Sequence, residues 1–151
     1  MFDDCYFLIP ARKGSKGFPF KNRKLFEYTA ITIPRDLRHK VFVSTNDENI
    51  KEQARGYEFN VIDRPEYLAE DISSLKDVML HFIRTEKPPK DSKIILLFLT
   101  YPERSWLDIK NIYNFFLNKQ ATSLICAEKV KEHPYLTFYE KEDDKAKLVV
   151  D

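Results

Sequence analysis

Positive charge and glycine are concentrated in one short stretch of the sequence, ARKGSKGFPFKNRK at residues 11–24. This stretch contains six lysines and arginines, no acid, and two of the chain's three glycines. Gly14 and Gly17 would let the backbone approach a phosphate closely, and successive N–H groups would form an anion-binding nest. The side chains that could bind the same anion are Arg12, Ser15, Lys16 and Lys21. We predict a phosphate-binding loop here, with a solvated basic loop as the alternative.

Composition and motif spacing exclude several classes of protein. The glycines fit neither the P-loop pattern nor GxGxxG, so dinucleotide binding has little support. The 25 basic and 24 acidic residues leave a net charge of +1, so a protein that coats nucleic acid is not expected. The sequence has no secretory signal and no apolar run near the roughly 18 residues that span a bilayer. We expect a cytoplasmic protein in which Cys5 and Cys126 are buried free thiols.

Apolar, β-prone runs alternate with helical patterns along the chain. Strands are predicted at residues 5–10, 40–45, 59–63, 93–100 and 122–129. The run at 93–100 is the strongest, so it is expected in the centre of the sheet. Helices are predicted at 23–33, 50–57, 75–82 and 109–116, and a closing hairpin at 135–140 and 147–151. The alternation predicts a three-layer α/β/α, Rossmann-like domain with a mostly parallel sheet.

Polar residues follow the predicted strands, at the edge of such a sheet where ligands bind. Capping boxes are expected at Thr45 with Glu48, Ser74 with Asp77, and Ser105 with Asp108. The polar residues behind the second, third and fourth strands include Ser44, Thr45, Asn46, Arg64, Thr100, Tyr101, Glu103 and Arg104. Three of the four strand ends therefore carry arginine or lysine, which predicts an anionic ligand.

Four segments resemble the acylneuraminate cytidylyltransferases, also called CMP-sialic acid synthetases. IPARKGSKGFPFKN at 9–22 is similar to their PAR-x-GSKG-x-P-x-KN signature. The segments STNDENI, DRPEYLAEDISSLKDVMLHFI and LLFLTYPER resemble three further blocks in the same order. The resemblance implies a fold of the nucleotide-diphosphosugar-transferase type. It also implies that residues 1–151 form a single domain, the N-terminal nucleotide-binding part of a longer family fold.

The same resemblance implies a reaction and a set of site residues. The anomeric hydroxyl of a sialic acid-like nonulosonic acid would attack the α-phosphate of CTP, with Mg²⁺ present, and pyrophosphate would leave. Lys21 and Arg12 would stabilise charge at the phosphates, and Thr100 and Arg104 would lie on the sugar side. The nucleotide-binding residues would be Pro10, Ala11, Arg12, Gly14, Ser15, Lys16, Gly17, Lys21, Asn22, Arg64 and Ser74. The implied partners are CTP, the sugar acid and a second subunit, with no nucleic acid and no membrane.

Several of these residues also have purely structural interpretations. Arg64 could pair with Glu66 or Asp71, Ser74 could cap a helix, and Asn22 could be the N-cap of the first helix. Glu103 and Arg104 could form a surface pair.

The sequence also departs from the family pattern. Lys13 stands where a small or uncharged residue is usual, Asn46 replaces an aspartate, and Phe98-Leu99 replaces Gln-Pro. Family members continue into a dimerisation element and a carboxylate pair that holds Mg²⁺, and these 151 residues contain neither. No metal ligand is therefore assigned. A Kdo-type cytidylyltransferase and a weak or inactive CTP-binding domain are the alternative functions.

Overall fold

The computed structural model describes residues 1–14, 18–127, 138–140 and 146–148. The chain divides into two compact units, Met1–Tyr113 and Asn114–Asp151. The predicted loop residues Ser15, Lys16 and Gly17 lie outside the described residues.

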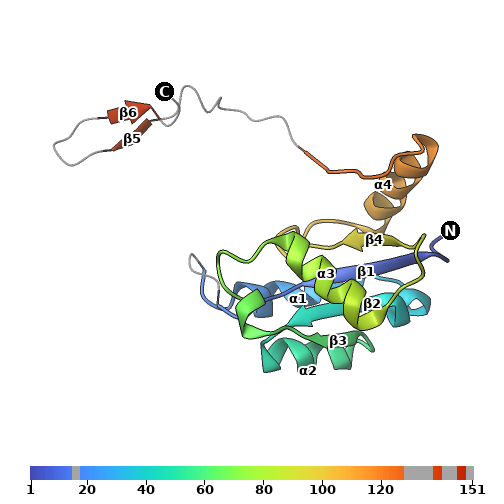
Figure 1. Cartoon of the computed structure of the whole chain (residues 1–151), viewed down its shortest axis with the longest axis horizontal. Coiled ribbons are helices and arrows are strands. Elements are labelled where there is room, and N and C mark those ends of the chain that lie inside the picture. Colours follow the sequence, from blue (N-terminus) through green and yellow to red (C-terminus); the bar gives the residue numbers. More distant parts are fainter. Residues whose placement is uncertain (15–17, 128–137, 141–145, 149–151) are drawn as a thin grey trace. The chain divides into compact units, whose positions relative to one another are not determined.

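The first unit is built on a four-stranded parallel sheet with the order β3-β2-β1-β4 (Figure 1). Its strands are β1 (Cys5–Pro10), β2 (Val41–Thr45), β3 (Asn60–Asp63) and β4 (Lys93–Leu96). Strands β1 and β2 are flanked on both sides, and every residue of β2 is buried. Continuous apolar runs such as CYFLIP are typical of strands covered on both faces. The predicted parallel sheet is confirmed.

Helices cover both faces of this sheet. The helices are α1 (Lys21–Thr32), α2 (Glu48–Gly56), α3 (Leu75–Glu86) and α4 (Trp106–Asn118), with short 3₁₀ turns η1 (Arg35–Lys40) and η2 (Glu66–Leu68). Phe82 of α3 packs with Leu8 and Phe42 on one face, and α3 lies in front of the sheet in Figure 1. The neighbouring β1 residue Phe7 points to the opposite face, where its ring contacts Trp106 of α4. The alternation of side chains along β1 therefore produces the three predicted layers.

Strand β4 differs from the prediction in both length and position. It ends at Leu96 rather than residue 100, and among the described residues it pairs only with β1, so it is an edge strand. Leu97 and Leu99 lie beyond the strand but are each only 2% exposed, which explains why the apolar run extends past the end of β4. Hydrophobicity alone does not distinguish a buried loop from a strand.

The predicted fifth strand at 122–129 is also wrong where it can be assessed. Residues 122–127 form no strand, and 128–129 lie outside the described residues. Ile125 is 90% exposed, and Cys126 is exposed rather than buried, whereas Cys5 is buried as expected. The apolar segment therefore lacks the packing that its composition predicted.

The second unit contains an antiparallel pair, β5 (Phe138–Glu140) with β6 (Ala146–Leu148). This pairing confirms the predicted hairpin, although its turn and outer ends lie outside the described residues.

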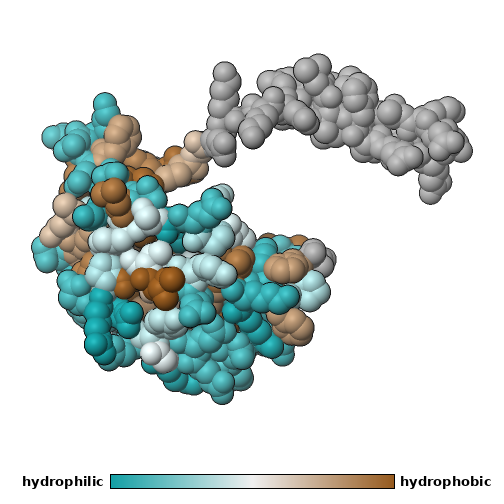
Figure 2. All heavy atoms as spheres, turned by 180° about the vertical axis from the view of Figure 1, so that it is seen from behind, coloured by the Kyte–Doolittle hydropathy of each residue, from teal (hydrophilic) through white to brown (hydrophobic). Residues whose placement is uncertain are grey.

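Hydrophobic side chains also reach the surface. Figure 2 shows a face on which the compact part is mainly hydrophilic, with several hydrophobic patches. On α4, Ile109 and Tyr113 are buried, whereas Leu107 and Phe115 are 58% and 55% exposed. No helix in the described part of the chain is long and apolar enough to cross a bilayer.

Candidate active site

A cavity of about 250 Å³ opens beyond the carboxyl end of β1. It is lined by Pro10, Arg12, Lys21, Asn22, Arg64, Ser73, Leu75, Val78, Phe98, Leu99 and Thr100. Six of the predicted site residues therefore converge on one space, as expected for a ligand site at the carboxyl edge of a parallel sheet. Arginine, lysine and asparagine form part of the lining, and the apolar side chains of Pro10, Leu75, Val78, Phe98 and Leu99 form another part.

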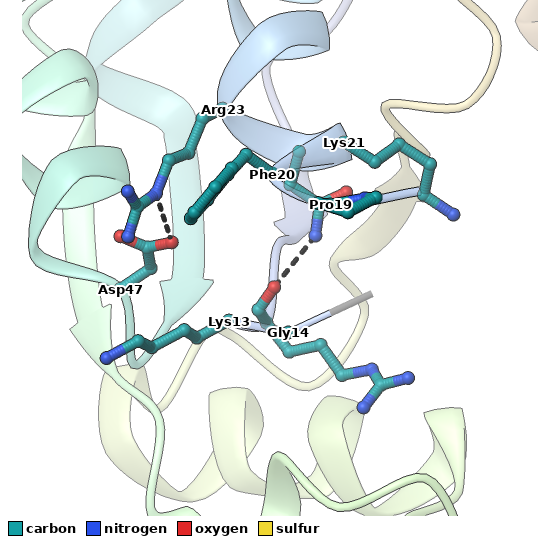
Figure 3. Close-up of a pocket in the computed structure, with 9 residues that line it drawn as sticks. Lys13, Gly14, Pro19, Phe20, Lys21, Arg23 and Asp47 are labelled. Atoms are coloured by element: carbon teal, nitrogen blue, oxygen red, sulfur yellow. Dashed lines mark hydrogen bonds and ion pairs between the residues drawn. The ribbon is translucent and has the colours of Figure 1, made fainter. Parts of the chain in front are cut away.

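A second hollow of about 220 Å³ shares Arg12, Lys21 and Asn22 with this cavity. Its other lining residues are Lys13, Gly14, Pro19, Phe20, Arg23 and Asp47. In Figure 3, Lys13 and Lys21 lie on opposite sides of this hollow and their ammonium groups point apart. Gly14 has a φ of +78°, a conformation that glycine adopts at little cost. The described residues of the predicted loop thus form a cationic rim around two adjoining spaces.

Arg12 is held by the loop that follows β3. Its Nη1 donates to the Ala69 carbonyl at 3.1 Å, and its Nη2 pairs with Asp71 Oδ1 at 2.5 Å. An ion pair of this kind fixes the guanidinium in a defined direction. A phosphate that binds Arg12 therefore has to share or replace the Asp71 contact.

Arg64 is a buried cation, only 8% exposed. Its Nε donates to the Leu68 carbonyl at 2.7 Å. Among the described residues it forms no ion pair, so the structural alternative, a pairing with Glu66 or Asp71, is not borne out: Asp71 pairs with Arg12 instead. Burial lowers the pKa of Arg64, and the nearby charge of Arg12 lowers it further. Two like charges facing one cavity create a position where an anion is stabilised.

Lys21 is the first residue of α1 and lines both spaces. The described part of the chain offers it no ion pair or hydrogen bond from its ammonium group. The helix begins after Phe20, whose φ is 57° and which provides no side-chain cap. Uncapped helix N-termini favour negative charge, which adds to the charge of Lys21.

Asn22 lies in the first turn of α1, so the structural alternative that it is the N-cap is not borne out. Its Nδ2 donates instead to the Arg12 carbonyl at 2.9 Å. Both backbone groups of Ala11 also have partners within the protein: its N–H donates to the Ser44 carbonyl at 2.9 Å, and its carbonyl accepts from Thr45 Oγ1 at 2.5 Å. The N–H of Ala11 therefore has no proton to offer a bound base.

The second strand end also differs from the predicted capping. Thr45 does not form a box with Glu48, because it belongs to β2 and bonds Ala11. Asp47 is the N-cap of α2 and accepts from the Asn49 N–H at 3.0 Å. Asp47 also accepts from Arg23 Nε at 2.8 Å (Figure 3). Burial by itself raises the pKa of Asp47, but the bonds from Arg23 and Asn49 outweigh it and lower the pKa below its usual value.

Two predicted contacts lie next to the cavity rather than in it. Ser74 caps α3, accepting from the Asp77 N–H at 3.1 Å, and its neighbour Ser73 lines the cavity instead. Arg104 Nη2 donates to the Phe98 carbonyl at 3.3 Å and lines neither space. The expected box of Ser105 with Asp108 is confirmed.

Sequence reasoning missed part of the cavity lining. Leu75 and Val78 were assigned only to the packed face of a helix, although the first turn of α3 also borders the cavity. Helical spacing indicates an apolar face without distinguishing core from ligand.

The described residues do not form a metal site. They include no group of three histidine, cysteine, aspartate or glutamate side chains placed to hold an ion. Asp47 and Asp71 each pair with an arginine. The described residues therefore contain no ready-made cluster of side chains for the expected Mg²⁺.

Proteins similar in sequence include cytidylyltransferases. An N-acylneuraminate cytidylyltransferase of Streptococcus agalactiae serotype V is 27% identical over 138 residues, covering 85% of this chain and 33% of that protein. The post-translational flagellin modification protein B of Campylobacter coli is 32% identical over 149 residues, covering 91% of this chain and 63% of that protein. The predicted resemblance is confirmed, and the chain spans only part of the length of these relatives. No protein-family model matches the chain.

Solved structures confirm the fold. A CMP:2-keto-3-deoxy-manno-octonic acid synthetase complexed with CTP superposes with a TM-score of 0.57 at 18% identity, covering 79% of this chain and 49% of that chain. A cytidylyltransferase from Leptospira borgpetersenii serovar Hardjo-bovis gives a TM-score of 0.56 at 19% identity, covering 78% and 50%.

Proposed function

We propose that this chain is the nucleotide-binding domain of a cytidylyltransferase that joins CMP to a sialic acid-like nonulosonic acid. The observation that carries the proposal is the convergence of Arg12, Lys21 and Arg64 on one cavity at the carboxyl edge of the sheet. The four sequence blocks and the streptococcal relatives support the same class of reaction. The proposed partners are CTP, the sugar acid and a second copy of the chain, and the proposed location is the cytoplasm.

In the proposed reaction, the sugar's anomeric oxygen forms a bond to the α-phosphorus of CTP. The bond between the α-phosphorus and the oxygen that bridges the α- and β-phosphates breaks, and pyrophosphate leaves with that oxygen. The proton of the sugar hydroxyl passes to solvent. Such transfers depend on positioning and charge stabilisation more than on covalent chemistry. Lys21 is the catalytic residue of the proposal because its ammonium group lacks a partner among the described residues and borders both spaces.

The arginines and the apolar wall would bind the rest of the nucleotide. Arg12 and Arg64 would hold the phosphates, and Gly14 would allow the backbone close to them. The apolar surface of Phe98 and Leu99 would contact a flat ring such as cytosine or the apolar side of the sugar. We assign no step to Mg²⁺, since the described residues contain no group of three acidic, histidine or cysteine side chains placed to hold it.

A direct test is calorimetric titration of the chain with CTP and with UTP, followed by measurement of pyrophosphate release with sialic acid. The proposal expects CTP to bind more tightly than UTP, and the Lys21→Ala variant to lose affinity or turnover. Failure of CTP to bind at millimolar concentration, in folded protein supplied with Mg²⁺, would refute the proposal.

A Kdo-type transfer is the second candidate, since one structural neighbour is a synthetase for that sugar acid. Pyrophosphate release with Kdo but not with sialic acid would favour it. CTP binding without pyrophosphate release from either sugar acid would favour a non-catalytic binding domain.

A further inference from the structure

Two asparagine side chains bind the same peptide group at the start of the cationic loop. Asn22 Nδ2 donates to the Arg12 carbonyl at 2.9 Å. Asn46 Oδ1 accepts from the Lys13 N–H at 2.8 Å. This carbonyl and this N–H belong to the single peptide unit between Arg12 and Lys13. Because a peptide unit is planar, bonds to both of its ends fix its orientation.

Glu66 determines which way the Asn46 amide points. Asn46 Nδ2 donates to both carboxylate oxygens of Glu66, at 3.2 and 3.1 Å. An ionised carboxylate only accepts hydrogen bonds, so the NH₂ group of Asn46 must face Glu66. The oxygen of the same amide is then directed at the Lys13 N–H. An aspartate at position 46 could not donate to Glu66, and the two carboxylates would repel each other.

We propose that Asn22 and Asn46 are positioning residues, with Glu66 as the support of Asn46, and that they orient the Arg12–Lys13 peptide for triphosphate binding. The inference rests on the proposed function. This peptide lies between the two cationic side chains of Arg12 and Lys13 and precedes Gly14, whose φ of +78° turns the chain. The plane of the peptide therefore influences the directions in which the side chains of Arg12 and Lys13 leave the backbone. Asn46 lines neither cavity and acts through the loop, whereas Asn22 also lines both cavities.

The chain offers a matched control for a purely structural role. Asn60 also makes two hydrogen bonds from its side chain, to the His39 and Val41 carbonyls at 2.8 and 3.1 Å. It lies at the first residue of β3, the end of the sheet opposite the cavity. Asn46→Leu and Asn60→Leu each remove two or more hydrogen bonds without changing the net charge.

The experiment compares these two variants of the full chain for melting temperature and for CTP affinity by calorimetry. We expect similar losses of melting temperature, but a loss of CTP affinity of about tenfold or more only in Asn46→Leu. Equal CTP affinity in the two variants would overturn the inference.

A rescue experiment tests the role of Glu66. Asn46→Asp should weaken CTP binding, and Asn46→Asp combined with Glu66→Gln should recover most of the loss, because glutamine can donate to the new aspartate. If the double variant binds CTP no better than Asn46→Asp, the support role of Glu66 is refuted.

Hydrogen exchange of the Lys13 amide separates this inference from the proposed function. The amide should exchange slowly in the wild-type chain and faster in Asn46→Leu, with or without nucleotide. A wild-type chain in which this amide exchanges slowly but which binds no CTP would refute the proposed function, while the Arg12–Lys13 peptide would still be shown to be held by Asn46. Rapid exchange of the Lys13 amide in the wild-type chain would refute the inference that Asn46 fixes the orientation of this peptide.

Discussion

Arg64 is a cation buried against backbone oxygen, with the positive Arg12 nearby. Sequence reasoning placed it at the site because it follows the third strand, but it could not determine its partner. Asp71 is seven residues from Arg64 and was a reasonable candidate, yet it bonds Arg12, which is 59 residues away in sequence. Position behind a strand is a local property, whereas pairing depends on the loop path that brings distant residues together.

We expect Arg64→Met to weaken CTP binding by at least about tenfold, because one charge-assisted contact is worth roughly 1.5–3 kcal/mol. Stability should change little by comparison, since replacing a buried charge by an apolar group of similar size is often neutral. Calorimetry and thermal melting measure the two effects. Arg38→Met serves as the control, because Arg38 pairs with Glu58 and lines neither cavity. Unchanged CTP affinity in Arg64→Met would contradict an anion-binding role.

Asp47 gives a prediction about pH. The folded protein lowers the pKa of Asp47 below its ordinary value of 3.8, so its contribution to stability is complete above that value and is lost as the pH falls through the folded pKa. Asp47→Ala should lose about 1–2 kcal/mol at pH 7 through the missing cap and ion pair. Urea unfolding at pH 7 and near pH 3 should show a smaller difference between wild type and variant at the lower pH. A difference that is independent of pH would show that another group is responsible.

At the scale of elements, the order of strands and helices could be predicted from sequence more reliably than their ends. Residues 5–10 were predicted correctly as β1 because the apolar run is bounded by acids and by the glycine loop. The strand at 93–100 was predicted too long, since Leu97 and Leu99 remain buried after the pairing with β1 has ended. Edge or central position depends on which strands pair, and periodicity contains no such information.

The start of α3 separates capping from nucleotide binding at Ser74. Ser74→Ala should lower stability by about 0.5–2 kcal/mol, whereas Ser74→Asn should retain the cap and most of that stability. Because Ser73 rather than Ser74 lines the cavity, CTP affinity should stay the same in both variants. Chemical denaturation and calorimetry provide the two measurements. A loss of CTP affinity in Ser74→Asn, with stability preserved, would show that Ser74 contributes to nucleotide binding.

At the scale of the whole molecule, charge is balanced overall and uneven locally. A net charge of +1 coexists with six positive residues between Arg12 and Lys24. Attraction of a polyanion to such a rim is screened by salt, with a Debye length of about 10 Å at 0.1 M. The affinity for CTP should therefore fall several-fold as salt rises from about 0.05 to about 0.5 M, while the binding of uncharged cytidine should not. Equal salt dependence for the two ligands would argue against a phosphate-binding rim.

The contact between Arg12 and Asp71 has a consequence for selectivity among nucleotides. In the nucleotide-free protein, the Arg12 guanidinium already forms an ion pair with the Asp71 carboxylate. An anionic ligand must compete with this carboxylate for Arg12, and a triphosphate competes more effectively than a single phosphate because it carries more anionic oxygens. CMP and the CMP-sugar product would therefore bind more weakly than CTP. Weak product binding favours turnover, because the product dissociates readily and the next CTP can bind.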